Sequence, residues 1–394
     1  MAGNGSMAAD RIRIFARGLT GSLGRVPARF VEDALAGIYT SRSVHLTDMA
    51  VALDEDIAVH ATHKRLSRNL ARLEVRETVT DCLLKIAARR VRKDTRLIIH
   101  VRNLHKKYAR KMQYLLPEAG LPELDADGYR ICEVVACELG ASSYTPLIAH
   151  LWSPNAPDFT TDCDQIIHTI GRVLRATNGR GVIYHDESIV LHGASVSQLI
   201  RVPGLRGILQ GNSFLEDTWI YKDQPMRGSE LVAITKTPYG LTLYKILNGV
   251  ELPIICEVGS VTIQHPDFPE RPLSLIVIKH NGPYFRDQPT QPTLLLSTEA
   301  DNCSRKSLTD FLSGFSTTQQ VVDSNLAHKE RYNLSGFRVL TYDRLRALMT
   351  LLEATTFFEA AVERRSAIGD KLVTLEPRPG NHRRAFLVPD SLAG

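Results

Sequence analysis

The sequence predicts a mixed α/β protein, and three observations lead to this prediction. The first quarter of the chain has the periodicity of amphipathic helices, and residues 96–186 contain β-rich runs and one helix. Residues 205–292 contain many short β-rich segments that glycine and proline separate. At 394 residues, 43% of them hydrophobic and 23% charged, the chain has enough apolar material for two or three folded domains and is not disordered.

The N-terminal helices include one with a basic face. Residues 27–38 place apolar side chains on one face of a helix, and a short helix follows around residues 49–53. After an acidic break at residues 54–56, a second helix is expected from Val59 to Leu73. A short helix, a turn and a basic helix resemble a helix-turn-helix, whose second helix enters the DNA major groove. An ordinary helical hairpin with a solvated basic face is the alternative.

The charge of the chain is unevenly distributed. Residues 1–111 carry 22 Lys and Arg against 11 Asp and Glu, whereas residues 112–394 carry 26 against 32. A local positive field of this kind favours contact with a polyanion such as DNA, although a merely solvated basic face is the other interpretation. The second basic cluster, residues 102–111, is expected to span two and a half helical turns. The residues predicted to contact DNA are His63, Lys64, Arg65, Arg68 and Arg72 in the helix, and Arg102, Lys106, Lys107, Arg110 and Lys111 in this cluster.

The middle of the chain predicts a particular order of elements. The expected strands and helix are Leu97–Val101, Tyr129–Leu139, Thr145–Trp152, the helix Gln165–Ala176, and the strand Val182–Asp186. The order strand, strand, strand, helix, strand is that of the ribonuclease-H-like fold, and two hairpins before one crossover predict a mixed sheet. Further along, strands are expected at 198–202, 230–235 and 293–297, and helices at 307–331 and 344–364.

A ribonuclease-H-like nuclease needs three carboxylates around two divalent metal ions. They lie at the end of the first strand, at the end of the fourth strand, and on a late helix that faces both. Asp186 ends the fourth predicted strand, as this chemistry requires. The first strand has His100 where a carboxylate is needed.

Four blocks of the sequence resemble bacterial insertion-sequence DDE transposases. They are Leu97–Met112, Leu151–Phe159, Gly181–Asp186 and Gly314–Leu340, in the same order as in that family. The last block resembles the helix with the signature Tyr-x2-Arg-x3-Glu-x6-Lys, and its four positions hold Phe315, Thr318, Val322 and Lys329. The resemblance covers residues 44–355.

The resemblance implies a degenerate active site. In active members an Asp stands at the position of His100 and a Glu at that of Val322, so Asp186 is the one catalytic carboxylate retained and the remaining candidate metal ligand. Because hard Mg²⁺ prefers oxygen ligands, the loss of two carboxylates argues against metal binding. Lys329 stands where active members contact a DNA phosphate, and a solvated helix residue is the alternative for it.

These inferences predict a transposase-derived DNA-binding protein that lacks nuclease and strand-transfer activity. The alternative is an active DDE transposase with unusual ligands, drawn from His100, Asp186, Glu187 and Asp323, and a decayed gene product without a role is a third hypothesis. The expected partner is double-stranded DNA, such as terminal inverted repeats, and the resemblance implies a second copy of the chain as a further partner. No cofactor is expected, except Mg²⁺ or Mn²⁺ if the alternative holds. Six scattered cysteines and the lack of a long apolar run predict a cytoplasmic protein. The resemblance implies that it is bacterial and associated with the nucleoid.

The predicted organisation has six parts. They are residues 1–10 as an added tail or a disordered start, 11–93 as a helical DNA-binding domain, 94–204 as the first part of the ribonuclease-H-like core, 205–292 as a β-rich insertion, 293–340 as the second part of the core, and 341–394 as a C-terminal helix and a loose tail.

Overall fold

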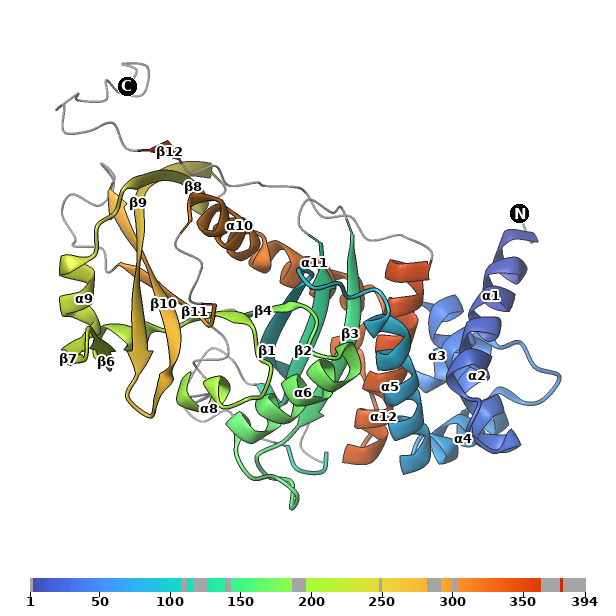
Figure 1. Ribbon diagram of the computed structural model, residues 1–394. Coiled ribbons are helices and arrows are strands. Elements are labelled where there is room, and N and C mark those ends of the chain that lie inside the picture. Colours follow the sequence, from blue (N-terminus) through green and yellow to red (C-terminus); the bar gives the residue numbers. More distant parts are fainter. Residues whose placement is uncertain are drawn as a thin grey trace.

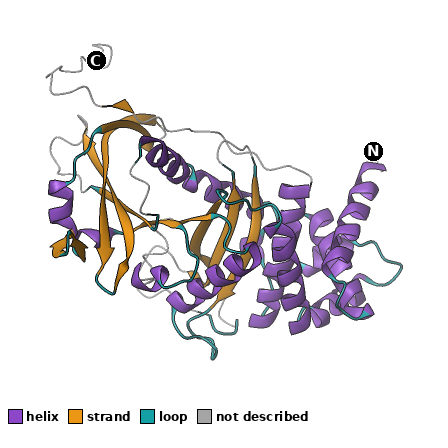
Figure 2. Ribbon diagram, in the orientation of Figure 1, coloured by secondary structure: helices purple, strands orange, loops and turns teal. Residues whose placement is uncertain are grey.

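One mixed sheet runs through most of the molecule, and helices cover it (Figures 1 and 2). The structure is a computed structural model, which describes residues 3–107, 112–115, 126–138, 143–185, 196–247, 250–281, 292–299, 304–362 and 376–377. Figure 1 shows an elongated arrangement, with the strands β8–β10 at one end, β1–β3 in the middle and the N-terminal helices at the other end. The chain is therefore a mixed α/β protein, as predicted.

The central part of the sheet has five strands in the order β3-β2-β1-β4-β5. The pairs β3–β2 and β2–β1 are antiparallel, whereas β4 is parallel to both β1 and β5. Helix α6 (Asp162–Thr177) forms the crossover from β3 to β4, which confirms the predicted order of elements. The strands are β1 (Arg96–Lys107), β2 (Ala126–Cys137), β3 (Tyr144–Trp152), β4 (Val182–His185) and β5 (Gly207–Gln210).

The β-rich stretch after β5 extends the same sheet. Strand β11 pairs antiparallel with β5 on one side and with β10 on the other, so the sheet continues into β9 and β8. The further strands are β6 (Thr218–Tyr221), β7 (Gln224–Arg227), β8 (Tyr239–Leu247), β9 (Val250–His265), β10 (Phe268–Asn281), β11 (Thr293–Ser297) and β12 (Glu376–Pro377).

Two apolar cores lie on the two faces of the central strands. Leu97 and Ile99 belong to a large core with α6, whereas Ile98 and Tyr184 belong to a second core under α10 and α11. The alternation of buried side chains along β1 thus fills both cores. The helices outside the crossover are α1 (Gly3–Leu19), α2 (Arg25–Ser41), α3 (Leu46–Ala52), α4 (Val59–Asn69), α5 (Leu73–Ala88), α8 (Val196–Ile200), α9 (Gly228–Ile234), α10 (Arg305–Ser316), α11 (Thr318–Glu330) and α12 (Tyr342–Phe357), which a π-helical segment (Phe358–Val362) continues.

Two of the expected strands are helices in the structure. The segment predicted as a strand at 198–202 contains the end of α8, and the fifth strand of the core is β5, several residues later. The segment predicted as a strand at 230–235 belongs to α9, whose first turn is closed by Glu230 accepting a hydrogen bond from the backbone N–H of Arg227 at 2.8 Å. A short apolar run does not distinguish a strand from a helix by its periodicity, which explains both errors.

Three further expectations near the N-terminus are corrected. Helix α1 begins at Gly3, so most of the stretch expected to be a disordered start is helical. The basic helix is α4, which ends at Asn69 rather than continuing to Leu73. The residues from Arg102 to Lys107 form part of β1, not a helix, because they pair with β2 over their whole length and these ladder bonds outweigh the helix propensity of Lys and Arg.

No helix of the described ranges is long and apolar enough to cross a membrane. Five cysteines, Cys82, Cys132, Cys137, Cys163 and Cys256, are free thiols, and Cys303 lies outside the described residues.

A buried charge cluster connects the N-terminal helices to the C-terminal ones. Glu359, in the π-helical segment, forms an ion pair with Arg42 at the end of α2 and accepts a hydrogen bond from His328 of α11 at 2.7 Å. Arg42 also donates to the hydroxyl of Tyr332 at 2.6 Å. Burial alone would raise the pKa of Glu359, but hydrogen bonds from His328, Tyr332 and Arg42 lower it to about 2. The ionised carboxylate therefore stabilises this junction.

We predict that Glu359→Gln flattens the dependence of stability on pH. Because the folded pKa lies below the ordinary value of 4.5, the carboxylate's contribution is present above that value and is lost as the pH falls towards 2. Between pH 5 and 2.5 the wild type should lose about 2 kcal/mol more than the variant in urea-unfolding free energy. Glu216→Gln, at an exposed position, serves as the control and should follow the wild type. Parallel curves for the wild type and Glu359→Gln would contradict the assignment.

Candidate functional site

The candidate site lies where α11 crosses the face of the central strands. His100 is half-buried in β1, on the same face as Ile98, and its register partner on β2 is Glu133. Val322 of α11 is buried in the same apolar core as Ile98. Strand β4 ends at His185, so Asp186 lies outside the described residues. Helix α11, which carries Val322, contacts β1, which carries His100.

A chain of buried charges fills the centre of this site. Lys329 of α11 is fully buried, and its ammonium group donates to Glu133 Oε1 at 2.5 Å. The same ammonium group forms an ion pair with Glu353 of α12. Arg102 of β1 donates through Nε to Glu133 Oε2 at 3.1 Å. Two cations and two carboxylates from four elements are therefore paired inside the protein, and we call Arg102, Glu133, Lys329 and Glu353 the central charge cluster.

The pKa values of the two carboxylates of the central charge cluster are shifted in opposite directions. Burial would raise the pKa of Glu133, but Arg102 and Lys329 together hold it well below its usual range. Burial does raise the pKa of Glu353, because Lys329 is the cation in direct contact with it and only partly offsets the loss of water. The two carboxylates in turn raise the pKa of Lys329 against the effect of burial. Lys329 is therefore a charged group shared by two carboxylates.

This burial corrects both interpretations of Lys329. A side chain with no exposed surface is neither a solvated helix residue nor in reach of a DNA phosphate. The sequence contains the partners of Lys329, but Glu133 is 196 residues away and no local spacing relates the two. Glu133 and Glu353 were missed for the same reason.

The described residues around His100 and Val322 do not fit a two-metal site. Such a site needs several carboxylate oxygens directed at the ions. Val322 offers none, and the two oxygens of Glu133 already accept hydrogen bonds from Arg102 and Lys329. Among the described residues no group of three or more His, Cys, Asp or Glu side chains is arranged to hold a metal ion. Asp323, the neighbour of Val322, is exposed and accepts a hydrogen bond from Gln319 at 2.8 Å.

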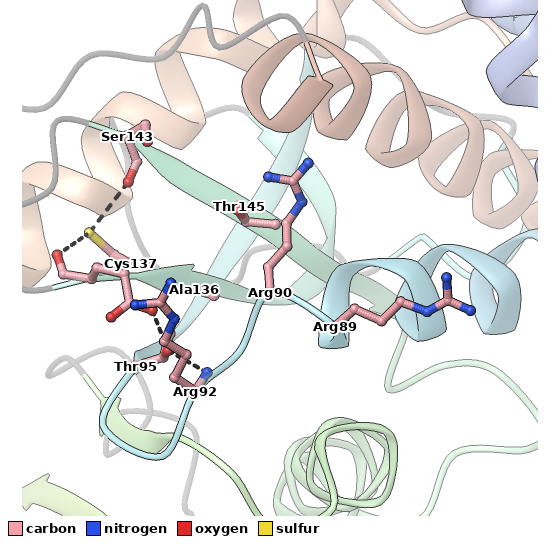
Figure 3. A pocket seen from close by; sticks show the side chains of 9 residues that line it. Arg89, Arg90, Arg92, Thr95, Ala136, Cys137, Ser143 and Thr145 are labelled. Carbon is pink, nitrogen blue, oxygen red and sulfur yellow. Dashed lines mark hydrogen bonds between the residues drawn. The ribbon is translucent and has the colours of Figure 1, made fainter.

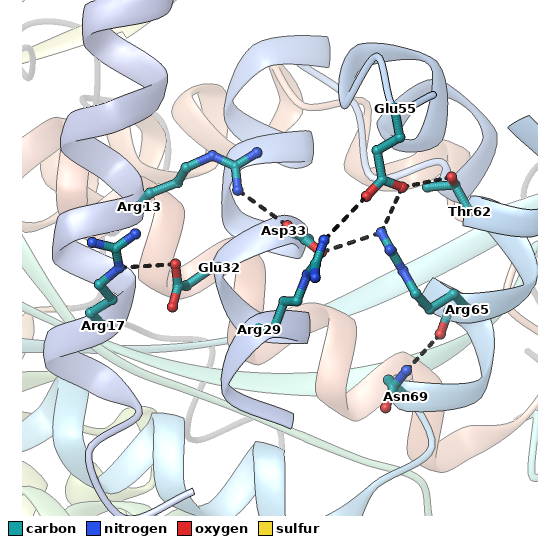
Figure 4. Close-up of polar contacts among 9 residues, drawn as sticks. All are labelled: Arg13, Arg17, Arg29, Glu32, Asp33, Glu55, Thr62, Arg65 and Asn69. Carbon is teal, nitrogen blue, oxygen red and sulfur yellow. Dashed lines mark hydrogen bonds and ion pairs between the residues drawn. The ribbon is translucent and has the colours of Figure 1, made fainter. Parts of the chain in front are cut away.

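The residues predicted to contact DNA on α4 differ in their exposure and in their ion pairs. Lys64 and Arg68 are exposed, whereas His63 is half-buried. Arg72, just after α4, is exposed and forms an ion pair with Glu74 at 3.2 Å. Arg65 points inward instead, and Figure 4 shows it between the two acidic residues that it pairs with. It contacts Glu55 at 2.7 Å and Asp33 at 3.2 Å.

The pairing of Arg65 removes it from the predicted DNA contacts. Asp33 is also paired with Arg13 of α1 at 3.1 Å, so this network joins α1, α2 and α4 (Figure 4). Its physical role is to hold the helices together. Sequence periodicity did not reveal this, because Arg65 lies at the border between the apolar and the basic faces of α4.

The second predicted cluster is only partly described. Arg102 belongs to the central charge cluster and is therefore no free phosphate contact. The backbone of Lys106 and Lys107 lies in β1, but their side chains, and the whole of Arg110 and Lys111, lie outside the described part of the chain. Their contact with DNA stays a prediction.

One basic segment was missed by the sequence analysis. Residues 89–93, which read Arg-Arg-Val-Arg-Lys, connect α5 to β1, and their four cations are exposed. Four of these five residues are basic, so the sequence alone could have indicated a site here. They contributed only to the excess of positive charge in residues 1–111.

Comparisons with known proteins add no family to these observations. No protein-family model matches the sequence, and a search of the curated proteins found no significant match.

We predict that Lys329→Met strongly destabilises the protein. The variant leaves Glu353 buried without its cation and Glu133 with Arg102 alone, and such broken buried pairs cost about 3–5 kcal/mol. The double variant Lys329→Met, Glu353→Gln should recover part of this loss because it removes the uncompensated charge. Urea unfolding measures both, with Lys236→Met at an exposed position as the control. If Lys329→Met lowers the free energy of unfolding by less than about 1 kcal/mol, the effect is that of a surface ion pair, and the assignment of Lys329 to a buried ion pair is refuted.

Proposed function

We propose that the chain is a transposase-derived DNA-binding protein without nuclease or strand-transfer activity. The observation that carries this proposal is the central charge cluster, in which Glu133, the register partner of His100 on β2, is already paired with Arg102 and Lys329. The order of strands and the crossover helix α6 support a ribonuclease-H-like core. The resemblance of four sequence blocks supports the transposase origin.

The electrostatics of the site support the loss of catalysis. A divalent ion near His100 would meet Glu133, whose negative charge is already neutralised by Arg102 and Lys329. To bind there, the ion would have to displace Arg102 and Lys329 from Glu133, which would leave Lys329 with Glu353 alone and Arg102 without this carboxylate. Such a loss of pairing is unfavourable in a low-dielectric interior. At the third position, Val322 lies within an apolar core. Asp186 alone does not supply the charge that two ions require.

The exposed face of α4 supports contact with DNA. His60, Lys64 and Arg68 are spaced four residues apart, so they lie along one side of the helix, and all three are exposed. Within the described part of the chain none of them takes part in an ion pair, so the charges of Lys64 and Arg68 are available to a ligand. We call these three residues the α4 stripe. A basic stripe on the second helix of such a pair is the arrangement that phosphate contact or groove binding uses.

We expect removal of two charges from the α4 stripe to weaken DNA binding. Binding is measured by a fluorescence-anisotropy titration of duplex DNA at several salt concentrations. The double variant Lys64→Ala, Arg68→Ala should make the negative slope of the log association constant against log salt shallower by about 2, one for each lost phosphate contact. The control Lys236→Ala with Lys306→Ala removes two exposed cations elsewhere and should leave the slope unchanged. The absence of wild-type binding at about 50 mM salt, where phosphate contacts are strongest, would rule out the proposed function.

A cleavage assay separates the proposal from the active alternative. The wild type, incubated with Mg²⁺ or Mn²⁺ and a DNA that carries terminal inverted repeats, should neither nick nor join it. Cleavage that disappears in Asp186→Ala would instead favour an active transposase with unusual ligands. The variant His100→Asp, Val322→Glu tests the assigned register, because a gain of metal-dependent cleavage requires both positions to face the metal site.

A further inference from the structure

A polar pocket lies where β1 begins. Because β1 and β4 are parallel neighbours, this is the opposite end of the strands from the C-terminal end of β4. Its volume is about 340 Å³, which is within the range of ligand-binding pockets. Figure 3 shows it between the end of α5 and the neighbouring ends of β2 and β3, with Arg90 and Arg92 extending towards the strands and Arg89 lying further out. The described lining residues are Arg89, Arg90, Arg92, Thr95, Ala136, Cys137, Glu138, Ser143 and Thr145.

The three arginines of this pocket are free to bind a ligand. Arg89, Arg90 and Arg92 are exposed, and within the described ranges none of them forms an ion pair. The guanidinium group of Arg90 lies 6.0 Å from the centre of the Phe357 ring, an aromatic contact that leaves its N–H donors available. By contrast, the nearby Arg206 is engaged with Glu299 and with a backbone carbonyl oxygen.

The negative charge around the pocket is smaller than the positive charge. Glu138 is the one carboxylate among the described lining residues, and it accepts a hydrogen bond from the hydroxyl of Thr95. The C-terminal end of α5 adds about half a negative charge. Three arginines therefore leave a clear positive excess in a concave site, where low-dielectric walls strengthen the field. The hydroxyl groups of Ser143 and Thr145 add neutral donors beside the arginines.

We propose that this pocket binds a phosphate group. Guanidinium groups donate two parallel hydrogen bonds to phosphate oxygens, and hydroxyls can donate to a third, so the lining matches a tetrahedral anion with several acceptors. Resting on the proposed function, we assign the phosphate to the backbone of bound DNA. The pocket is then a second contact, separate from the α4 stripe, and Lys93 beside it extends the positive surface.

Two variants with opposite expected effects test the pocket. Arg90→Ala with Arg92→Ala should raise the Kd for duplex DNA roughly ten- to hundredfold at 50 mM salt and lower the salt slope by about 2. Glu138→Gln keeps an oxygen that accepts from Thr95 but removes the opposing charge, so it should tighten binding roughly twofold to tenfold. Lys236→Ala with Lys306→Ala is again the control. Circular dichroism and thermal unfolding check that each variant is folded.

The outcomes separate the pocket from the proposed function. If the wild type binds DNA and the Arg90/Arg92 variant matches the control, the pocket proposal is overturned and the proposed function stands. If the wild type binds no DNA, the proposed function fails, and calorimetric titration with inorganic phosphate decides on the pocket. Phosphate binding that the Arg90/Arg92 variant loses would support a phosphate site, and no binding would overturn it. A preference for an acidic peptide over phosphate and DNA would also overturn it.

Discussion

The ion pair between Lys329 and Glu133 is the contact on which the middle of the molecule depends. It joins α11 to β2, and through Arg102 and Glu353 it extends to β1 and α12. None of these four charges is stable in an apolar interior by itself, because the loss of water costs several kcal/mol for each ion. They can be buried only together, and their burial requires four elements in one arrangement. The cluster is thus a source of specificity for this packing, more than a source of net stability.

The same pairing has a consequence for chemistry. A metal-dependent nuclease keeps an excess of negative charge at the centre of its site so that cations bind there. Here the excess is absent among the described residues, since Glu133 is neutralised from both sides and Val322 is apolar. The positive charge of the protein lies instead on outer surfaces, on α4 and between α5 and β1. The surfaces that could attract a polyanion are therefore positively charged, while the place between α11 and the central strands lacks the negative charge that metal ions need.

The parts of the fold that could be predicted are those with local signals. The strands around Leu97 and Ile183 are apolar runs, and the helix α6 is a periodic segment with Gly179 just after it; all three appear where expected. The two strands that turned out to be α8 and α9 are short apolar runs without periodicity. The partners of Lys329 and Arg65 could not be predicted, because a buried ion pair depends on which distant elements pack together. The pocket at Arg90 and Arg92 could not be predicted either, since its walls come from three separate segments.

The pairing of β11 with β5 bears on how this protein can change during evolution. An insertion joined by two flexible linkers can be lost or exchanged with little effect on its host. Here, removal of the segment from β6 to β11 would expose the backbone N–H and C=O groups along one side of β5, at Ile208, Leu209 and Gln210. A newly exposed strand edge promotes aggregation. Descendants of this chain are therefore expected to vary the length of the loops in this region but to retain β11 beside β5.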